Sequence, residues 1–178
     1  MEYPCKDKLY RYLKNLGIIY KEPNGKLFPL SGGGISDFYV DVKKAYGHPL
    51  ALEAIVDAVL EQIESETTCV AARGYGGVPL ASTLAMKGGF NLTLIRDAEK
   101  KHGKGGSIDG YVPNKNDGVA IIDDVFTTGR NLRKCAEILK PTEAKIVGGY
   151  VIVRRADGNL DDLGIPVKHI FTVEELVA

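Results

Sequence analysis

The sequence predicts an α/β fold in which a mostly parallel, twisted sheet is flanked by helices. Short β-branched runs recur along the chain and helix-like segments separate them, a pattern typical of βαβ units and of a sheet that is covered on both faces. The chain has 178 residues, the length of one domain with room for a small lid or appendage. A chain of this length buries roughly 70% of its unfolded surface, so its core needs no disulfide or metal.

The first third of the chain is predicted to contain two helices with extended pieces between them. Leu9, Leu13 and Leu16 stand at helical spacing before Gly17, which is a typical helix stop. Residues 26–45 form short extended segments interrupted by three consecutive glycines. Residues 49–64 begin with a proline and repeat apolar side chains at i, i+3, i+4 and i+7, which predicts an amphipathic helix.

The rest of the chain is predicted to supply the sheet. The expected strands are residues 69–72, 91–95, 118–122, 144–153 and 167–171. A helix-like segment follows the first of them, and a short helix is expected after the last. In sheets of this kind, ligands bind beyond the carboxyl ends of the strands. The loops with unusual residues all lie at those ends.

Charge and cysteine content exclude several classes of protein. Lys plus Arg and Asp plus Glu both number 23, which argues against a nucleic-acid-binding domain with a strongly basic face. The three cysteines are widely spaced, with no CxxC pair or Cys/His cluster typical of zinc sites. The N-terminus lacks the apolar core of a signal peptide, and no apolar run approaches the roughly 20 residues of a membrane span. We therefore expect a soluble, cytoplasmic domain.

The segment "IIDDVFTTGRN", residues 121–131, carries the chemistry. It combines a strand end, two hydroxyls, a glycine able to adopt positive φ and a following helix, whose N-terminus can bind phosphate without a lysine. Asp123 and Asp124 only accept hydrogen bonds, so they suit a pair of sugar hydroxyls or a cation. A ribose 5-phosphate satisfies both ends. The alternative is a solvated Asp-Asp turn in which Thr127 or Thr128 caps the helix.

Two common nucleotide-binding motifs are absent from the sequence. No GxxxxGK[ST] P-loop occurs. The segment "GYGGVP" begins like GxGxxG at Gly74 and Gly76, but Pro79 stands at the third glycine position, which argues against a Rossmann dinucleotide site.

The segment "IIDDVFTTG" resembles the phosphoribosyl-pyrophosphate (PRPP) signature of type I phosphoribosyltransferases. Four further segments, "LSGGGISDFYVD", "RGYGGVPLA", "IRDAEKKHGKGGSIDG" and "FTVEELVA", agree in order and spacing with the orotate branch of that family, particularly its short archaeal chains. The resemblance implies transfer of ribose 5-phosphate from PRPP to orotate, giving orotidine 5′-monophosphate and pyrophosphate in pyrimidine (UMP) biosynthesis. It also implies Mg²⁺, a homodimer and a small N-terminal hood on the type I fold.

The resemblance implies functional roles for the residues of this sequence that stand at the matching motif positions. The resemblance implies catalytic roles for Lys100, His102 and Asp124, with Asp123 and Asp124 on the ribose hydroxyls and Thr127 to Asn131 on the 5-phosphate. Arg73 to Gly76 are expected to form a loop beside the pyrophosphate, and Arg96, Lys100 and His102 to reach the partner's site. The full set implied for PRPP is Arg73, Gly74, Arg96, Lys100, His102, Asp123, Asp124, Val125, Phe126, Thr127, Thr128, Gly129, Arg130 and Asn131. Thr127 and Arg155 match orotate contacts, residues 31–41 match part of the hood, which extends over about residues 1–45, and Mg²⁺ is held mainly through PRPP.

The chemistry of the reaction agrees with these roles. Breaking the C1–O bond of a ribosyl pyrophosphate places positive charge on the sugar, which carboxylates stabilise, and negative charge on the leaving group, which cations stabilise. The reaction also requires exclusion of water by a lid. Residues 96–117 are polar and contain clustered basic residues and glycines, which predicts a mobile lid. The alternative is a charged surface hairpin.

Some assignments remain open from the sequence. Arg154 is a rival to Arg155 for a substrate carboxylate, and an ion pair of Arg155 with Asp157 is a purely structural alternative. Asp97, Gly76, the "GGGI" segment and the pair Arg130 and Asn131 depart from the common family pattern. Two alternative functions are a phosphoribosyltransferase for another base and a non-catalytic PRPP-sensing regulator.

Overall fold

The computed structural model describes residues 4–21, 24–25, 27–29, 35–96, 106–155 and 160–177. Its helices are α1 (Pro4–Asn15), α2 (Lys43–Tyr46), α3 (Pro49–Leu60), α4 (Gly74–Gly88), α5 (Arg130–Leu139) and α6 (Val173–Val177), with 3₁₀ turns η1 (Lys140–Thr142) and η2 (Asp161–Leu163). The main sheet contains β5 (Cys69–Arg73), β6 (Asn91–Ile95), β7 (Ile108–Gly110), β8 (Gly118–Phe126), β9 (Lys145–Arg154) and β10 (Val167–Thr172). Two small pairs use β1 (Ile19–Tyr20) with β4 (Tyr39–Val40) and β2 (Phe28–Pro29) with β3 (Ile35–Ser36).

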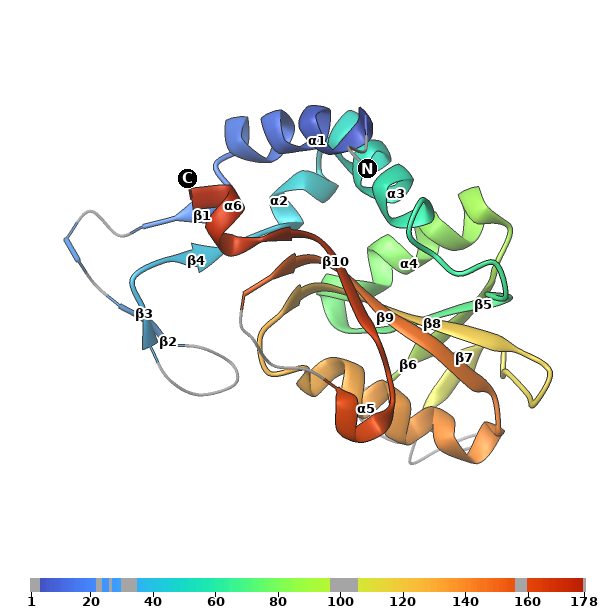
Figure 1. The fold of residues 1–178 in the computed structure, drawn as a ribbon. Coiled ribbons are helices and arrows are strands. Elements are labelled where there is room, and N and C mark those ends of the chain that lie inside the picture. Colours follow the sequence, from blue (N-terminus) through green and yellow to red (C-terminus); the bar gives the residue numbers. More distant parts are fainter. Residues whose placement is uncertain are drawn as a thin grey trace.

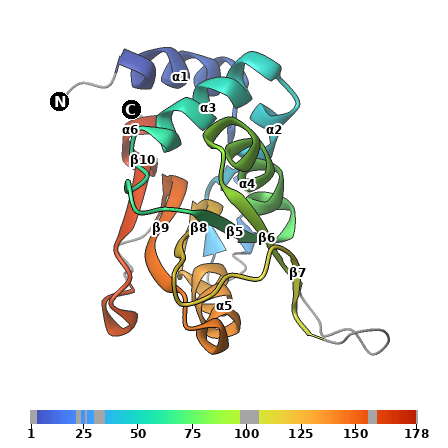
Figure 2. The same ribbon diagram turned by 90° about the vertical axis from the view of Figure 1, so that its right-hand side faces the viewer.

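The predicted α/β architecture is confirmed. In the described residues the main sheet has the order β10-β9-β8-β5-β6-β7, and every neighbouring pair is parallel except β6 with β7. Helices α1, α2, α3 and α4 lie on one side of this sheet and α5 on the other (Figures 1 and 2). Alternate residues of each central strand face opposite sides because successive side chains of a strand do so.

The core is therefore divided by the sheet into two clusters. Val70, Ala72, Ala120 and Ile122 belong to the cluster under α3 and α4. Cys69, Ala71, Val119 and Ile121, which alternate with them, belong to the cluster that includes Leu132 and Cys135 of α5. All eight strand residues are essentially inaccessible to solvent. Because both faces of these strands are buried, their sequences are continuously apolar rather than alternating.

The direction in which successive strands are added across the sheet reverses between β5 and β8, although these two strands are parallel. The connection from β5 through α4 leads to β6 on one side, whereas the connection from β8 through α5 leads to β9 on the other. Since these strands are parallel, the carboxyl ends of β5, β8 and β9 lie at the same edge. This position is a topological switch point, where open α/β sheets bind their ligands.

The predicted lid, residues 96–117, is only partly a loop. Residues 97–105 lie outside the described part of the chain. Residues 108–110 instead form β7, which pairs with β6, and residues 111–117 are anchored to the sheet through Asp117. The carboxylate of Asp117 accepts hydrogen bonds from Thr68 Oγ1 (2.7 Å), Tyr111 Oη (2.9 Å) and Asn114 N (2.9 Å). Residues 108–117 therefore form a strand and an anchored turn in this structure, and the mobile lid over residues 96–117 stays a prediction.

Asp117→Asn is expected to destabilise the protein by about 1–3 kcal/mol at neutral pH, because an amide group replaces an oxygen that accepts several hydrogen bonds. Burial would raise the pKa of Asp117, but the hydrogen bonds from Thr68, Asn114 and Tyr111 outweigh burial and lower it. Its stabilising effect is therefore present above the unfolded-state pKa and is lost as pH falls through the lower folded-state pKa.

Urea denaturation of wild type and Asp117→Asn at several pH values measures this difference. The gap in unfolding free energy should shrink below about pH 4, the usual range of an aspartate pKa. Lys115→Ala, in the same turn, is the control, because Lys115 is exposed. A gap of equal size at every pH would contradict the role given to the Asp117 charge.

Candidate active site

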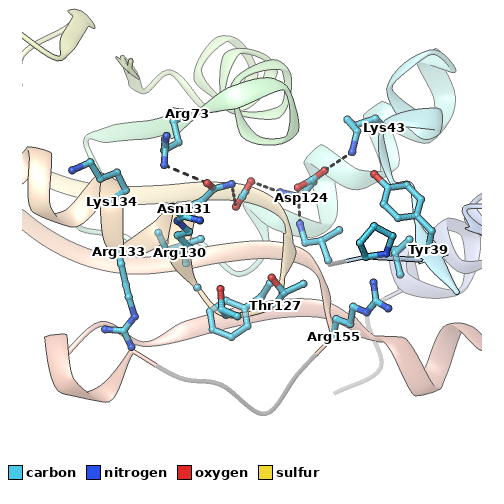
Figure 3. Close-up of a pocket in the computed structure, with 18 of the residues that line it drawn as sticks. Tyr39, Lys43, Arg73, Asp124, Thr127, Arg130, Asn131, Arg133, Lys134 and Arg155 are labelled. Atoms are coloured by element: carbon cyan, nitrogen blue, oxygen red, sulfur yellow. Dashed lines mark hydrogen bonds and ion pairs between the residues drawn. The ribbon is translucent and has the colours of Figure 1, made fainter. Parts of the chain in front are cut away.

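A large cleft opens at the switch point, over the carboxyl ends of β5, β8 and β9. Its volume is about 1340 Å³, enough for two small substrates. Figure 3 shows its lining, which comes from the ends of these strands, from the first turns of α5 and from the N-terminal elements β2, β4 and α2.

Strand β8 extends further than the sequence suggested. It was expected to end at Ile122, before the acids, but Asp123 and Val125 continue the pairing with Val151 and Val153 of β9. Asp123 is 3% exposed and Asp124 9% exposed. Charged side chains are tolerated at this depth because they border the cleft and have polar partners.

The two acids are held from both ends by a row of polar contacts (Figure 3). Asn131 Nδ2 donates to Asp123 Oδ2 at 3.0 Å, and Arg73 Nη1 donates to Asn131 Oδ1 at 3.4 Å. At the other end, Lys43 Nζ lies 3.2 Å from Asp124 Oδ2. Within the strand, Asp124 N donates to Asp123 Oδ1 and Val125 N donates to Asp124 Oδ1. The carboxylates thus have fixed orientations and retain lone pairs that face the cleft.

Burial raises the pKa of Asp123 to about 7, and the negative charge of the adjacent Asp124 adds to this effect. Burial, followed by the charges of Asp124 and Asp123, also raises the pKa of Tyr46. The phenol therefore stays protonated and donates a hydrogen bond to Gly76 O at 2.8 Å. This bond joins α2 to the first turn of α4, directly above the acids.

The turn after β8 is shorter than the sequence suggested. Gly129 has φ +72° and is the N-cap of α5, so neither threonine caps the helix. Arg130 and Asn131 lie in the first turn of α5, and the side chain of Asn131 is directed to Asp123. The loop proper is therefore Thr127 to Gly129, with free N–H groups of the helix start beside it.

Arg73 and Gly74 are not part of a loop. Arg73 ends β5, and Gly74, with φ +67°, begins α4 immediately. Arg73 lines the cleft, whereas Gly74 is not among its lining residues. A Cβ atom at Gly76 would lie 2.5 Å from Asp124 Cγ, far inside van der Waals contact. A side chain at position 76 therefore requires the Asp124 carboxylate to move.

At the far end of the cleft, Arg155 is the arginine that faces the cavity (Figure 3). Its guanidinium lies 4.5 Å from the centre of the Phe38 ring and donates to Phe38 O at 3.0 Å. Arg154 instead lies over the buried Phe126 ring. Tyr39 lines the same end and is 39% exposed. The proposed ion pair with Asp157 falls outside the described residues.

The structure thus brings together most of the sequence-derived site. The residues that line the cleft are Arg73, Asp123, Asp124, Val125, Phe126, Thr127, Thr128, Gly129, Arg130, Asn131 and Arg155. Arg96 lies elsewhere, in an ion pair with Asp109. Lys100 and His102, like residues 31–34 of the hood, are outside the described part of the chain.

Sequence reasoning missed Lys43, Arg133 and Lys134, which also line the cleft. No motif marks Lys43, since it follows an extended segment far from the acids in sequence. Arg133 and Lys134 are recognisable only from their spacing along α5 relative to the turn. The cleft-lining residues include six basic and three acidic side chains, whereas the whole chain has no net charge. Positive charge is therefore concentrated where a polyanionic ligand would bind.

The described residues contain no cluster of metal-binding side chains and no helix that could span a membrane. They contain no group of three or more His, Cys, Asp or Glu side chains arranged to hold a metal ion. No helix of this part of the chain is long and apolar enough to cross a membrane. The acid pair itself has partners in the strand, in α2 and in α5, and fits hydroxyl groups better than a protein-built metal cage.

Comparison with known proteins places the chain in a family. Residues 44–175 match the model of the phosphoribosyl transferase domain. The chain is 34% identical to the orotate phosphoribosyltransferase of Methanopyrus kandleri over 84% of its length and 81% of the relative. It is 32% identical to that of Pyrococcus horikoshii, over 96% and 92% of the two chains. The crystal structure of orotate phosphoribosyltransferase from Aeropyrum pernix superposes with a TM-score of 0.81 at 27% identity, covering 95% of this chain and 96% of that one.

Proposed function

Because this chain belongs to the phosphoribosyltransferase family, we propose that it transfers ribose 5-phosphate from PRPP to orotate, yielding orotidine 5′-monophosphate and pyrophosphate for pyrimidine nucleotide synthesis. The observation that carries the proposal is the buried acid pair in the middle of an otherwise basic cleft. A sugar with a phosphate on each side matches this distribution of charge.

The substrate is oriented by three parts of the cleft. The turn from Thr127 to Gly129 and the N-terminus of α5 receive the 5-phosphate. Asp123 and Asp124 accept hydrogen bonds from the 2- and 3-hydroxyls of the ribose. Arg73, at the end of β5 on the Asn131 side of the acids, binds the pyrophosphate.

During transfer, the C1–O bond to pyrophosphate breaks and its electron pair leaves with the pyrophosphate. A ring nitrogen of orotate donates the electron pair that forms the new bond to C1 and loses its proton, which is released with the pyrophosphate. Positive charge develops on the sugar ring in the transition state, as in other sugar transfers. Fixed carboxylates beside the ring stabilise this charge without reorganisation.

Orotate is assigned to the end of the cleft at Arg155 and Thr127. The guanidinium of Arg155 has a geometry that suits the carboxylate of orotate, and Tyr39 offers an aromatic face for the flat base. Magnesium would be held mainly through PRPP rather than by protein side chains, and it would supply further positive charge to the leaving group.

A homodimer with lid exchange is part of the proposal. Arg96 forms an ion pair with Asp109 and does not line the cleft of its own subunit. Tyr75 of α4, two residues after Arg73, is 90% exposed, and Met86 of the same helix is 80% exposed. Large exposed apolar side chains of this kind support a contact with a second subunit.

Lys100→Ala is expected to lower kcat about 30-fold with a smaller effect on the KM for PRPP, because a lid cation acts mainly on the departing pyrophosphate. The magnitude corresponds to one charge-assisted hydrogen bond of about 2 kcal/mol. Steady-state kinetics measure the effect, with Lys115→Ala as the control beyond β7. Unchanged kcat would contradict the role of Lys100.

The proposed function is tested with purified protein, PRPP and magnesium. Orotate and a panel of other bases are supplied separately, and loss of orotate absorbance and release of pyrophosphate are followed. Turnover of orotate at a far higher kcat/KM than any other base is the expected result. Preference for a different base would revise the substrate, and PRPP binding with no turnover of any base would favour the sensor alternative.

A further inference from the structure

Lys43 is a basic residue of the cleft that belongs to none of the recognised motifs. It begins α2, a one-turn helix whose position is fixed by the buried Val42 and Ala45 and by the hydrogen bond from Tyr46 Oη to Gly76 O. Because α2 is anchored on α4, the Lys43 side chain has a defined origin beside the acid pair.

The contact of Lys43 with the acids is direct. Its Nζ lies 3.2 Å from Asp124 Oδ2 and 3.6 Å from Asp41 Oδ1. The side chain of Lys43 is 40% exposed, whereas that of Asp124 is 13% exposed, so the lysine reaches a deep carboxylate from the mouth of the cleft (Figure 3). At the opposite end, Arg73 contacts Asn131, which in turn bonds Asp123.

We propose that Lys43 is a positioning residue of the transfer reaction. Its ammonium group holds the Asp124 side chain turned into the cleft and sets a positive charge against it, and so favours negative charge on the acid pair where positive charge develops on the sugar. This inference rests on the proposed function and extends it to a residue outside the PRPP-binding motif.

The electrostatics of the site agree with this role. Two adjacent buried carboxylates repel each other, and such pairs tend to retain a proton. Burial alone would lower the pKa of Lys43, but the charge of Asp124, together with Tyr39 and Asp41, raises it, so the lysine stays charged. Tyr46, a further titratable group of the described residues near the pair, has a pKa raised by burial and stays neutral. Removal of Lys43 leaves the acids to relieve their repulsion by taking up a proton at higher pH.

Three variants test the inference: Lys43→Met, Lys43→Arg and the control Lys44→Met. Lys44 follows Lys43 in sequence but donates to Gly17 O on the other side of α2 and does not line the cleft. In Lys43→Met, the acid limb of the kcat/KM profile for PRPP is expected to move upward by about one pH unit. The resulting loss is roughly fivefold to tenfold at pH 7 and shrinks toward pH 9. Lys43→Arg is expected to keep the wild-type profile.

A readout without turnover completes the test. In protein labelled with ¹³C at aspartate carboxyl carbons, the titration of the acid pair is assigned by comparison with Asp123→Asn. Its midpoint should rise in Lys43→Met and stay unchanged in Lys44→Met. Equal midpoints and equal pH profiles in wild type and Lys43→Met would overturn the inference, as would a loss of activity that does not vary with pH. Failure of wild type and Lys44→Met to use orotate would instead reject the proposed function.

Discussion

Asp124→Asn is expected to lower kcat/KM for PRPP by about 100- to 1000-fold, the usual effect of losing a fixed group that stabilises transition-state charge. The amide keeps the size of the carboxylate but removes its negative charge. It also places an N–H₂ group or a weaker acceptor opposite the Lys43 ammonium, 3.2 Å away in the wild type. The acid pair would then bind the sugar hydroxyls less tightly and stabilise the positive charge at C1 less strongly.

Steady-state kinetics with saturating orotate measure this effect, and thermal denaturation reports whether the variant folds. Asp7→Asn, on the exposed face of α1, is the matched control and should retain full activity. Wild-type kcat/KM in a folded Asp124→Asn protein would remove the acid pair from the mechanism and leave the interpretation of a solvated turn.

Gly76→Ala is expected to lower turnover about 100-fold or more while leaving the protein folded. The added methyl group would lie 2.5 Å from Asp124 Cγ and 2.8 Å from Asp124 Oδ2, so the carboxylate must rotate away from the cleft and from Lys43. Displacement of a reacting or stabilising group by about 1 Å commonly costs a factor of about 100 in rate. Gly76 has no positive φ, so the effect is steric rather than conformational.

A double-mutant cycle separates this mechanism from general damage to α4. If the methyl group acts by displacing Asp124, Gly76→Ala should cost little in the Asp124→Asn background, because the two changes are then not additive. Gly47→Ala is the matched control, since a Cβ at that position meets only Lys44 O at 3.6 Å. Full additivity of Gly76→Ala with Asp124→Asn would contradict the steric explanation.

The fold class could be predicted from local sequence patterns, and so could the group of residues proposed for the centre of the site. The strands of the sheet are recognisable because residues such as Val119 to Ile122 are buried on both sides and so read as apolar runs. The turn from Thr127 to Gly129 was predicted because hydroxyls and a glycine before a helix start suit an anion-binding turn. These signals are local, and a single segment of chain contains all of them.

The residues that reach the cleft from distant parts of the chain could not be predicted from the sequence and are known from the packing of the elements. Lys43 meets Asp124, and Tyr46 meets Gly76, because α2 packs on α4. The choice of Arg155 over Arg154 depends on which face of the chain turns to the cleft after β9. The anchoring of residues 111–117 depends on Thr68, far away in sequence. These contacts follow from packing between segments, and no local propensity or motif records which surfaces will meet.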